Sequence, residues 1–520
     1  MENIYLSTLL DYINIKPSQV FSFEKHLFLI LKHTIIMTDV FLEDYFMFHS
    51  TRGEKLVSSP MAILNGLADD GGLYVIDKVP TLNYHDLLND DYQTIAAKVL
   101  NKFFPEFSYD EIKKELDIAY STFDIKEVVG MKKADRAYFL ELFHGPTLAF
   151  KDQALVVLPR LMKLSKEKLG YEKNITILTA TSGDTGGAAL NGFKDVDGVS
   201  IVVLYPNGGV SPVQEAQMCS FRGENAKVLA LEGNFDDCQT FVKEFFKNHK
   251  DLSLSSANSI NIARLAPQVV YYFYSYVYLL RNGVIKDNEA INFDVPTGNF
   301  GNIFAGYYAK AMGLPIKNLI CASNKNCVLT DFFMNGKYNK NRPFFKTNSP
   351  SMDILISSNL ERFLYYGTKE STKETKKLME SLNTKGSYDF KNPFDYFYAY
   401  STDEKKTLEV IKEVYEKYKY LVDPHTAVAY NAYKKYFDET KDDSICVVIS
   451  TASPYKFPQS VLEAFDIEES DAFKAIHTLS EKFNLEIPKV LNYPKVEREI
   501  ISLKDSNSYV EEVVKCLESK

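Results

Sequence analysis

Short apolar runs alternate with segments of helical periodicity from Arg136 to Ser450. The runs are rich in Val, Ile and Leu, and the segments between them repeat apolar positions every three or four residues. Strands that alternate with helices at this spacing form βαβ units, whose strands pair in parallel. The pattern therefore predicts an α/β fold built on parallel sheets. The expected strands are 137–143, 175–180, 199–205, 227–231, 291–296, 319–322 and 444–450.

The chain before Arg136 has a different pattern. Residues 92–104 and 108–118 have helical periodicity, and a short strand candidate follows the turn at 69–72. This predicts a mainly helical N-terminal domain at 47–135 with one short hairpin. Residues 1–46 are aromatic and apolar without a clear period. They are either an N-terminal element or an upstream stretch, because Met37 and Met47 are both candidate start sites.

The rest of the chain divides into two α/β regions. Residues 152–255 contain enough strands and helices for one small, compact subdomain. Residues 136–151 and 256–520 are expected to form a larger α/β domain. Within it, residues 335–400 are rich in Lys, Asn, Ser and Tyr, and predict a long excursion of loops and helices.

Composition and charge narrow the class of protein. The 520 residues are 45% hydrophobic and 25% charged, as in an ordinary globular protein, and the net charge of −9 disfavours nucleic-acid and anionic-membrane partners. The longest apolar stretch, 27–37, is interrupted by Lys32 and His33 and is too short to span a bilayer. It also lacks the features of a secretory signal, so a cytoplasmic protein is expected.

The cysteines support the same location. None forms a Cys-x-x-Cys pair or a metal-ligand grouping with His, so we expect buried thiols in a reducing compartment and no metal site. The six are Cys219, Cys238, Cys321, Cys327, Cys446 and Cys516.

Two predicted strands end in glycine-rich turns, which is where ligands bind in open parallel sheets. Residues 181–187 (Thr-Ser-Gly-Asp-Thr-Gly-Gly) lie between a strand and a helix, and offer backbone N–H groups to an anion. Residues 296–302 (Pro-Thr-Gly-Asn-Phe-Gly-Asn) do the same, with Asn side chains as further donors. Residues 296–302 do not match a nucleotide-binding fingerprint, so a cofactor monophosphate is the expected anion at that turn. Each turn by itself also fits a purely steric role for glycine.

Lys151 is the third candidate. It follows His144–Phe150, a stretch without acidic or lysine side chains, and such surroundings lower the pKa of an amine and make it nucleophilic. By itself it equally fits a solvated ion pair with Asp152.

Taken together, these segments resemble the threonine synthase family, within the tryptophan-synthase-β-like group of pyridoxal-phosphate enzymes. The resemblance runs from His49 to Val461 and looks closest to the longer, yeast- and enterobacterial-type branch. It is carried by motifs in one order, at 66–74, 143–152, 179–186, 256–261, 296–302, 351–354, 423–428 and 450–454. One departure is Ser453, where many relatives have His after Thr-Ala; it is either a tolerated change or an altered acid–base support beside the cofactor ring.

The resemblance implies fold type II: two parallel-sheet α/β domains with the cofactor in the cleft between them, beside the helical N-terminal domain. It implies that Lys151 carries pyridoxal 5'-phosphate as a Schiff base and serves as the catalytic base. The implied cofactor contacts are Gly298, Asn299, Phe300, Gly301, Asn302 and Thr451, the last against the pyridine nitrogen. The implied substrate contacts are Ser182, Gly183, Asp184 and Thr185 for the α-carboxylate, and Asn258, Asn261 and Arg264 for the phosphate.

The implied reaction is O-phospho-L-homoserine plus water to L-threonine plus phosphate, the last step of threonine biosynthesis. Three alternatives stay open: a phospho-lyase that yields 2-oxobutyrate, a serine/threonine dehydratase, and a silent cofactor-binding homologue. The expected partner is the small-molecule substrate, with no nucleic acid and no membrane, and the chain is expected to be a monomer or a homodimer.

Overall fold

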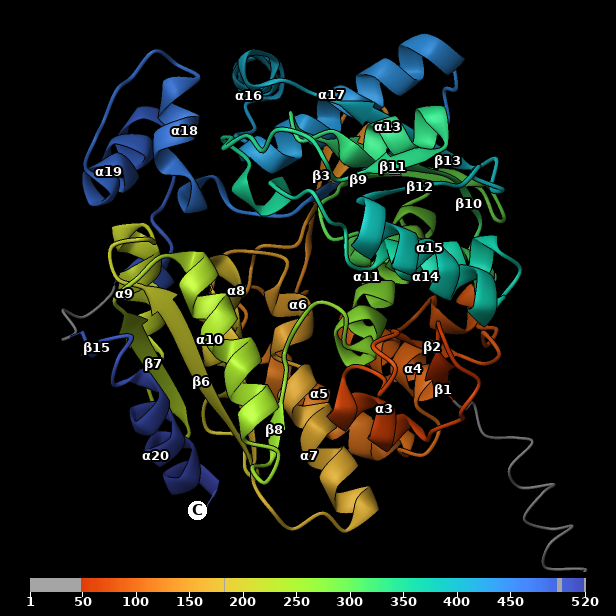
Figure 1. Cartoon of the computed structure of the whole chain (residues 1–520). Helices are drawn as coiled ribbons and strands as arrows, with labels where there is room; N and C mark the ends of the chain where they lie inside the picture. Colours follow the sequence, from red (N-terminus) through yellow and green to blue (C-terminus); the bar gives the residue numbers. More distant parts are fainter. Residues whose placement is uncertain (1–47, 182, 493–497, 519–520) are drawn as a thin grey trace, which may run out of the picture. The chain divides into compact units, whose positions relative to one another are not determined.

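The computed structural model describes residues 48–181, 183–492 and 498–518. The predicted N-terminal extension at 1–46 lies outside the described residues. Two large parallel sheets organise the described chain (Figure 1). The predicted α/β class with parallel sheets is therefore confirmed.

The first sheet has six strands in the order β13-β10-β9-β14-β4-β3. Neighbouring strands are parallel except for β3 and β4, which are antiparallel. Every residue of β9 and β14 is buried, as expected for central parallel strands covered by helices on both faces. The strands are β3 (Gly130–Ala134), β4 (Ala137–Glu141), β9 (Ile291–Pro296), β10 (Ile316–Ser323), β13 (Phe397–Ser401) and β14 (Cys446–Ser450).

The second sheet has five parallel strands in the order β15-β7-β6-β5-β8. Four of its strands lie in the predicted small subdomain, where three helices connect them in sequence. The strands are β5 (Ile175–Ala180), β6 (Val199–Pro206), β7 (Ala226–Leu231) and β8 (Leu254–Ser255). The helices are α8 (Asp184–Phe193), α9 (Pro212–Ser220) and α10 (Phe235–Asn248).

The fifth strand, β15 (Ile500–Ile501), comes from the end of the chain and pairs with β7. The helix after it, α20 (Ser506–Glu518), buries Val510, Val514 and Leu517 in the same apolar core as the strands. The prediction that all of 256–520 belongs with the larger domain is therefore wrong for this segment. Its helix carries an apolar stripe that covers the small sheet, and a two-residue strand leaves no periodicity in the sequence.

The N-terminal part is mainly helical, as the sequence pattern predicted. An antiparallel pair of short strands precedes two amphipathic helices that pack on each other. One boundary differs: β3 belongs to the six-stranded sheet, although the predicted helical domain extended to residue 135. The elements are β1 (Phe48–Ser50), α3 (Ser59–Asn65), β2 (Tyr74–Ile76), η1 (Tyr84–Leu87), α4 (Tyr92–Phe103) and α5 (Tyr109–Tyr120).

The long helix α11 (Ile262–Arg281) packs against both the N-terminal helix α4 and the sheet-covering helix α12 (Gly301–Ala311). Nearly all of its residues are buried, which explains its apolar and aromatic sequence. It therefore joins the N-terminal part to the six-stranded sheet.

The excursion at 335–400 contains loops and helices, as expected, and also a two-stranded sheet that the sequence pattern did not predict. Its aromatic rings pack together: Phe363 contacts Phe397, and it also contacts Phe332 in the preceding helix. Its elements and the helix before it are α13 (Val328–Asn335), β11 (Lys337–Asn339), η2 (Pro350–Met352), α14 (Leu360–Gly367), α15 (Thr372–Lys385) and β12 (Ser387–Asp389).

The remaining helices pack around these elements. They are α6 (Asp152–Leu155), α7 (Leu158–Leu169), α16 (Glu404–Tyr418), α17 (Pro424–Thr440), η3 (Pro454–Lys456), α18 (Pro458–Glu463), α19 (Ala472–Phe483) and η4 (Lys489–Leu491). Within the described ranges, none of the helices is long and apolar enough to cross a bilayer.

Candidate active site

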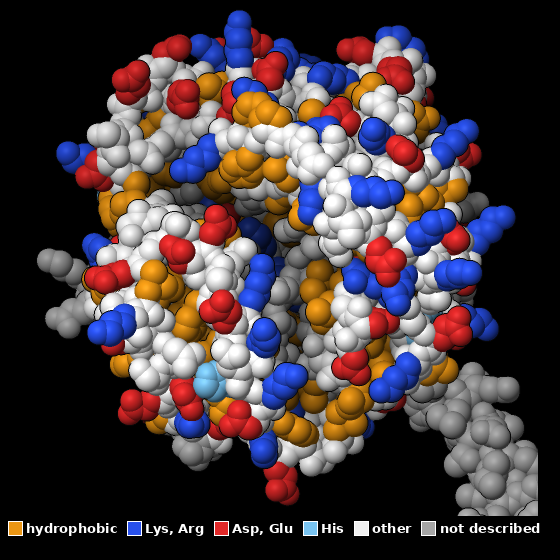
Figure 2. Space-filling view, viewed as in Figure 1, with side chains coloured by type: hydrophobic (Ala, Val, Ile, Leu, Met, Phe, Trp, Pro, Cys, Tyr) orange, Lys and Arg blue, Asp and Glu red, His pale blue; other side chains and the backbone are white. Residues whose placement is uncertain are grey.

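Lys151 lies at the start of α6, beside the end of strand β14. Phe150 N donates to Thr451 O at 2.8 Å, and Ala149 forms an isolated bridge with Ala452. These backbone bonds hold the lysine at the carboxyl end of the parallel strands, where ligands bind in this type of sheet. Figure 2 shows the face of the molecule hollowed along the strip where Figure 1 draws α6, with basic side chains gathered beside the hollow.

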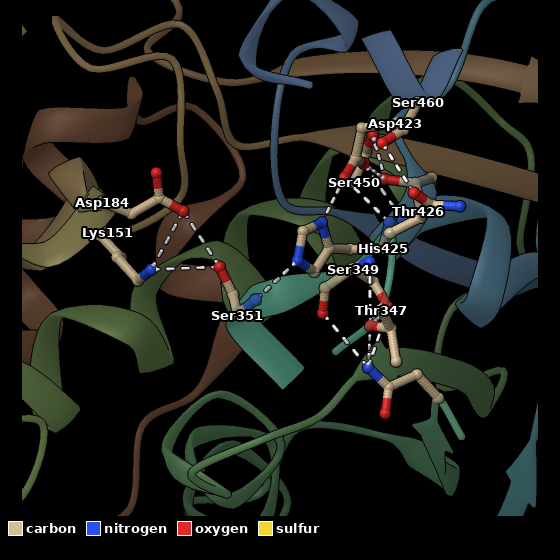
Figure 3. A network of polar contacts seen from close by, with 12 residues as sticks. Lys151, Asp184, Thr347, Ser349, Ser351, Asp423, His425, Thr426, Ser450 and Ser460 are labelled. Carbon is tan, nitrogen blue, oxygen red and sulfur yellow. Dashed lines mark hydrogen bonds and ion pairs between the residues drawn. The ribbon is translucent and has the colours of Figure 1, made fainter. Parts of the chain in front are cut away.

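The Lys151 amine belongs to a polar cluster (Figure 3). Its Nζ donates to Ser351 Oγ at 3.3 Å and lies 3.6 Å from Asp184 Oδ2. Burial lowers the pKa of Lys151; the carboxylate of Asp184 opposes this effect, while the cations Lys456 and Arg264 add to it. A lowered pKa increases the neutral fraction of the amine, which is its nucleophilic and basic form.

Asp184 is the first residue of α8 and the anion of this cluster. Its Oδ1 accepts from Gln214 Nε2 at 2.9 Å and lies 3.3 Å from Lys456 Nζ. Burial alone would raise the pKa of the Asp184 carboxyl, but the ammonium groups of Lys456 and Lys151 hold it well below its usual range. Asp184 is therefore ionised at neutral pH.

The turn that carries Asp184 is held by a buried threonine. Thr181 Oγ1 accepts from the backbone N–H groups of Gly183 and Gly186, each at 3.0 Å. Gly183 has φ 145°, and a Cβ there would lie 2.5 Å from Gln214 Oε1, so a residue with a side chain would be strained at this position. Thr185 is partly exposed beside it, and Ser182 lies outside the described residues. The described part of the turn presents backbone N–H groups at the start of a helix.

The second predicted turn, at 298–302, joins β9 to α12. Phe300 has φ 63°, the left-handed region, which curls the backbone before the helix begins. A Cβ on Gly298 would lie 2.8 Å from Ser351 O, so this turn and the Lys151 cluster meet at Ser351. Asn302 is buried; its Oδ1 accepts from Tyr271 at 2.6 Å, but its Nδ2 has no hydrogen-bond partner in the described structure.

An unpartnered buried donor at a helix N-terminus fits a bound phosphate. Burying an amide N–H without a partner costs about 1–3 kcal/mol, and an anion at this place would remove that cost. The backbone N–H groups at the start of α12 point to the same chemistry. The residues present therefore fit a cofactor monophosphate.

Thr451 and Ser453 follow β14 directly. Thr451 is buried, and its carbonyl oxygen accepts a hydrogen bond from Phe150 N, next to Lys151. Ser453 Oγ accepts from Tyr455 N at 3.3 Å and starts the turn η3, while its N donates to Leu148 O at 3.0 Å. Ser453 thus has a local capping role in this structure.

The three residues expected at the substrate phosphate differ in their surroundings. Asn258 is exposed. Asn261 caps α11 by accepting from Ala263 N, and it donates to Ile63 O at 2.9 Å. Both the oxygen and the nitrogen of its side-chain amide therefore have partners within the protein. Arg264 is buried with one donation, to Ala257 O at 2.9 Å, and its Nε has no hydrogen-bond partner in the described structure.

Arg264 is therefore a buried cation with spare donors. Burial lowers its pKa to about 10, yet at neutral pH it still carries its charge. It is close enough to Lys151 to lower the pKa of that amine. Of the three, Arg264 is the residue best suited to receive an anion.

Sequence reasoning gave no role to four residues that converge here: Ser351, Asp423, His425 and Lys456. The first three lie in motifs that carried the family resemblance, so the motifs could be recognised in the sequence, but the proximity of these residues in space could not. Lys456 Nζ is buried and donates to Thr147 O at 3.0 Å and Gln217 Oε1 at 2.8 Å. Among the residues that the structure describes, no group of His, Cys, Asp or Glu could hold a metal ion.

Comparison with known families gives the class. A model described as pyridoxal-phosphate dependent enzyme matches residues 131–451. Models of the threonine synthase N terminus and of the threonine synthase C-terminal part match residues 47–120 and 426–490. With its two parallel sheets and the lysine at the strand ends, the chain is a pyridoxal-phosphate-dependent enzyme of fold type II.

Individual relatives show which family within this class of enzymes the chain belongs to. Threonine synthase of Schizosaccharomyces pombe is 38% identical, with 79% of this chain and 88% of that protein covered, and the Saccharomyces cerevisiae enzyme is 37% identical, with 80% and 89% covered. The crystal structure of pyridoxal-phosphate-bound threonine synthase from Brucella melitensis has a TM-score of 0.82 and 36% identity, and covers 91% of this chain and 100% of that one. The chain belongs to the threonine synthase family.

Proposed function

We propose that this chain is a threonine synthase, which converts O-phospho-L-homoserine and water to L-threonine and phosphate. The observation that carries the proposal is the buried amine of Lys151, joined through Ser351 to a phosphate-type turn, in a chain of this family. Pyridoxal phosphate on Lys151 would supply an electron sink for the negative charge that develops next to the substrate amino group.

The turn at 298–302 is proposed to hold the cofactor phosphate. Gly298, Asn299, Phe300 and Gly301 would contribute backbone N–H groups, and Asn302 its unpartnered Nδ2. The Thr451 hydroxyl is proposed to face the pyridine nitrogen, because its backbone is bonded beside Lys151. A neutral hydroxyl in that position leaves the ring less protonated than a carboxylate would.

The substrate's two anionic groups need separate partners. The helix start at Gly183–Thr185 is proposed to bind the α-carboxylate, with Ser182 as a further candidate. Arg264 is proposed to bind the phosphate through the donors that remain free inside the protein. Asn258 and Asn261 remain weaker candidates, since Asn261 already bonds at both ends.

Lys151 is proposed as the base that moves protons along the substrate. Once the substrate amine takes its place on the cofactor, the free Lys151 Nζ would remove the α-proton and return protons at neighbouring carbons. Its lowered pKa favours the neutral form that this role requires. Movement of the small sheet with residues 152–255 over the substrate is proposed to exclude water until it is needed.

We also propose a cytoplasmic location. Within the described residues no cysteine forms a disulfide, and four of the six cysteines are buried, which suits a reducing compartment.

The experiment is Lys151→Ala, with Lys168→Ala as the control because Lys168 lies on the surface beside Glu111. The wild-type protein and the control should show the visible absorption band of a lysine-bound cofactor and release phosphate from O-phospho-L-homoserine. Lys151→Ala should lose both. A wild-type protein without that band would refute the role of Lys151.

A product assay separates threonine synthesis from the related eliminations. We expect one threonine for each phosphate released from O-phospho-L-homoserine. Release of 2-oxobutyrate in its place would identify a phospho-lyase, and a keto acid formed from serine or threonine would identify a dehydratase.

A further inference from the structure

Ser351 connects the Lys151 amine with the other parts of the site. Its Oγ accepts from Lys151 Nζ at 3.3 Å and donates to Asp184 Oδ2 at 3.1 Å. Its carbonyl oxygen lies against Gly298 in the phosphate-type turn. Figure 3 shows Lys151, Asp184 and Ser351 pointing toward one another from three separate segments.

The direction of the Ser351 hydroxyl follows from charge. Asp184 is ionised, because Lys456 lies 3.3 Å from its other oxygen, and a carboxylate only accepts hydrogen bonds. The hydroxyl hydrogen of Ser351 therefore goes to Asp184. Its lone pairs remain for Lys151, so Ser351 accepts from the amine and does not compete with it as a donor.

The backbone of Ser351 is held by a buried histidine. Ser351 N donates to His425 Nε2 at 3.1 Å, so this ring nitrogen carries no hydrogen. His425 Nδ1 then bears the hydrogen and donates to Asp423 Oδ2 at 2.7 Å. Asp423 is fully buried and also accepts from the backbone N–H groups of His425 at 2.9 Å and Thr426 at 3.1 Å.

These contacts form one chain from the buried Asp423 to the amine. Asp423 orients the ring of His425, the ring fixes the backbone of Ser351, and the Ser351 hydroxyl fixes Lys151. Neither ring nitrogen of His425 is left for solvent, since each has its own partner. The residue His425 is 2% exposed, which protects this arrangement from water.

We propose that Ser351 is a catalytic residue: it orients the Lys151 amine and accepts a hydrogen bond from the amine once the amine has taken a proton. His425 and Asp423 are positioning residues for Ser351. The inference rests on the proposed function for the identity of the reaction. In physical terms, the Ser351 hydroxyl accepts a hydrogen bond from the ammonium form of Lys151. A hydrogen bond to a charged group of this kind raises the pKa of the amine by about one unit.

The test measures the pKa of Lys151 in the full-length protein freed of cofactor. Competitive acetylation with trace acetic anhydride at a series of pH values, followed by peptide mass spectrometry, gives the fraction of neutral amine. The charged groups that act on this amine are Asp184, Lys456 and Arg264, and all three stay unchanged in the first variant.

That variant is Ser351→Ala, for which we expect the pKa of Lys151 to fall by about one unit. Ser351→Thr keeps the hydroxyl and should restore most of the difference. Ser349→Ala is the matched control, because Ser349 lies in the same segment but bonds to Asn324 at 3.0 Å.

Two variants of the histidine separate positioning from packing. His425→Gln places an acceptor near the position of Nε2 and should keep the Lys151 pKa close to that of the wild type. His425→Asn keeps only a group near Nδ1, so the contact to Ser351 is lost and the pKa should fall as in Ser351→Ala. Circular dichroism of each variant identifies any that fails to fold. If a histidine variant does not fold, the comparison of the Lys151 pKa in Ser351→Ala and Ser351→Thr decides the inference.

Turnover of the cofactor-loaded enzyme gives the second measurement. Ser351→Ala should lower kcat for O-phospho-L-homoserine about tenfold, with KM changed little, because Ser351 acts on the amine and not on the substrate anions. An unchanged Lys151 pKa in Ser351→Ala would overturn the inference. Because the acetylation measurement needs no substrate, a wild-type protein that fails to make threonine would refute only the proposed function.

Discussion

His144 lies between two carboxylates at the end of β4. Its Nδ1 is 2.9 Å from Asp124 Oδ1 and its Nε2 is 3.1 Å from Glu141 Oε2. Only the imidazolium form donates from both ring nitrogens. Burial alone would lower the pKa of His144, but the two carboxylates outweigh that effect and raise it to about 9.

This geometry predicts a stability difference that depends on pH. In the unfolded chain a histidine has a pKa of about 6.5. The charged His144 ring therefore stabilises the folded state fully below about pH 6.5, and this stabilisation is lost as the pH rises to about 9. At 1.36 kcal/mol per unit, a rise from 6.5 to about 9 corresponds to about 3.4 kcal/mol. The Asp124 side chain is 53% exposed and screened by water, so we expect about 1–2 kcal/mol.

The perturbation is His144→Gln, which is neutral at every pH. Urea unfolding should show the variant less stable than the wild type by about 1–2 kcal/mol near pH 6, with the difference vanishing near pH 10. His477→Gln is the control, since His477 is exposed on α19. A difference that is equal at both pH values would show that His144 stabilises the fold without its charge, and would refute the reasoning.

Three further predictions concern the site and its support. Thr451→Val should change the visible spectrum of the bound cofactor and slow turnover while the lysine linkage remains; an unchanged spectrum and rate would remove Thr451 from the site. Arg264→Gln should raise KM for O-phospho-L-homoserine by about 10- to 100-fold with the cofactor spectrum retained, because a charge-assisted bond to phosphate is lost, and an unchanged KM would contradict this. Gly192→Ala should lower the melting temperature through a cost of about 1–3 kcal/mol, since its Cβ would overlap the carbonyl oxygen of Leu155; equal melting curves would contradict the close packing of α8 on α6.

The parallel sheets could be predicted because their strands are buried on both faces. Runs such as Ile291–Pro296 and Val199–Pro206 are mostly apolar, are buried at every position and are bounded by helical segments, so pattern and structure agree. The turns at 181–187 and 298–302 and the position of Lys151 were visible for the same reason, since each follows a recognisable strand.

The convergence of side chains was not visible. Ser351, His425 and Lys456 lie far apart in the sequence, and each by itself is typical of an ordinary polar position. Their contacts depend on how α17, η2 and η3 meet, which is set by tertiary packing and not by local periodicity. The partners of Asn261 could not be foreseen either, because its donor contact is to a residue about two hundred positions earlier.

The return of β15 and α20 to the small sheet has a consequence for how the chain is made. On the ribosome, β5, β6 and β7 are synthesised long before Ile500 and Ile501, so β7 remains an unpaired edge until the last part of the chain emerges. An open, apolar edge strand is a site for mispairing with other chains. Truncation before Ile500 would therefore damage the part of the protein that carries Asp184, although Lys151 and the 298–302 turn are encoded elsewhere. Folding of the small sheet therefore waits for the synthesis of residues 500–518.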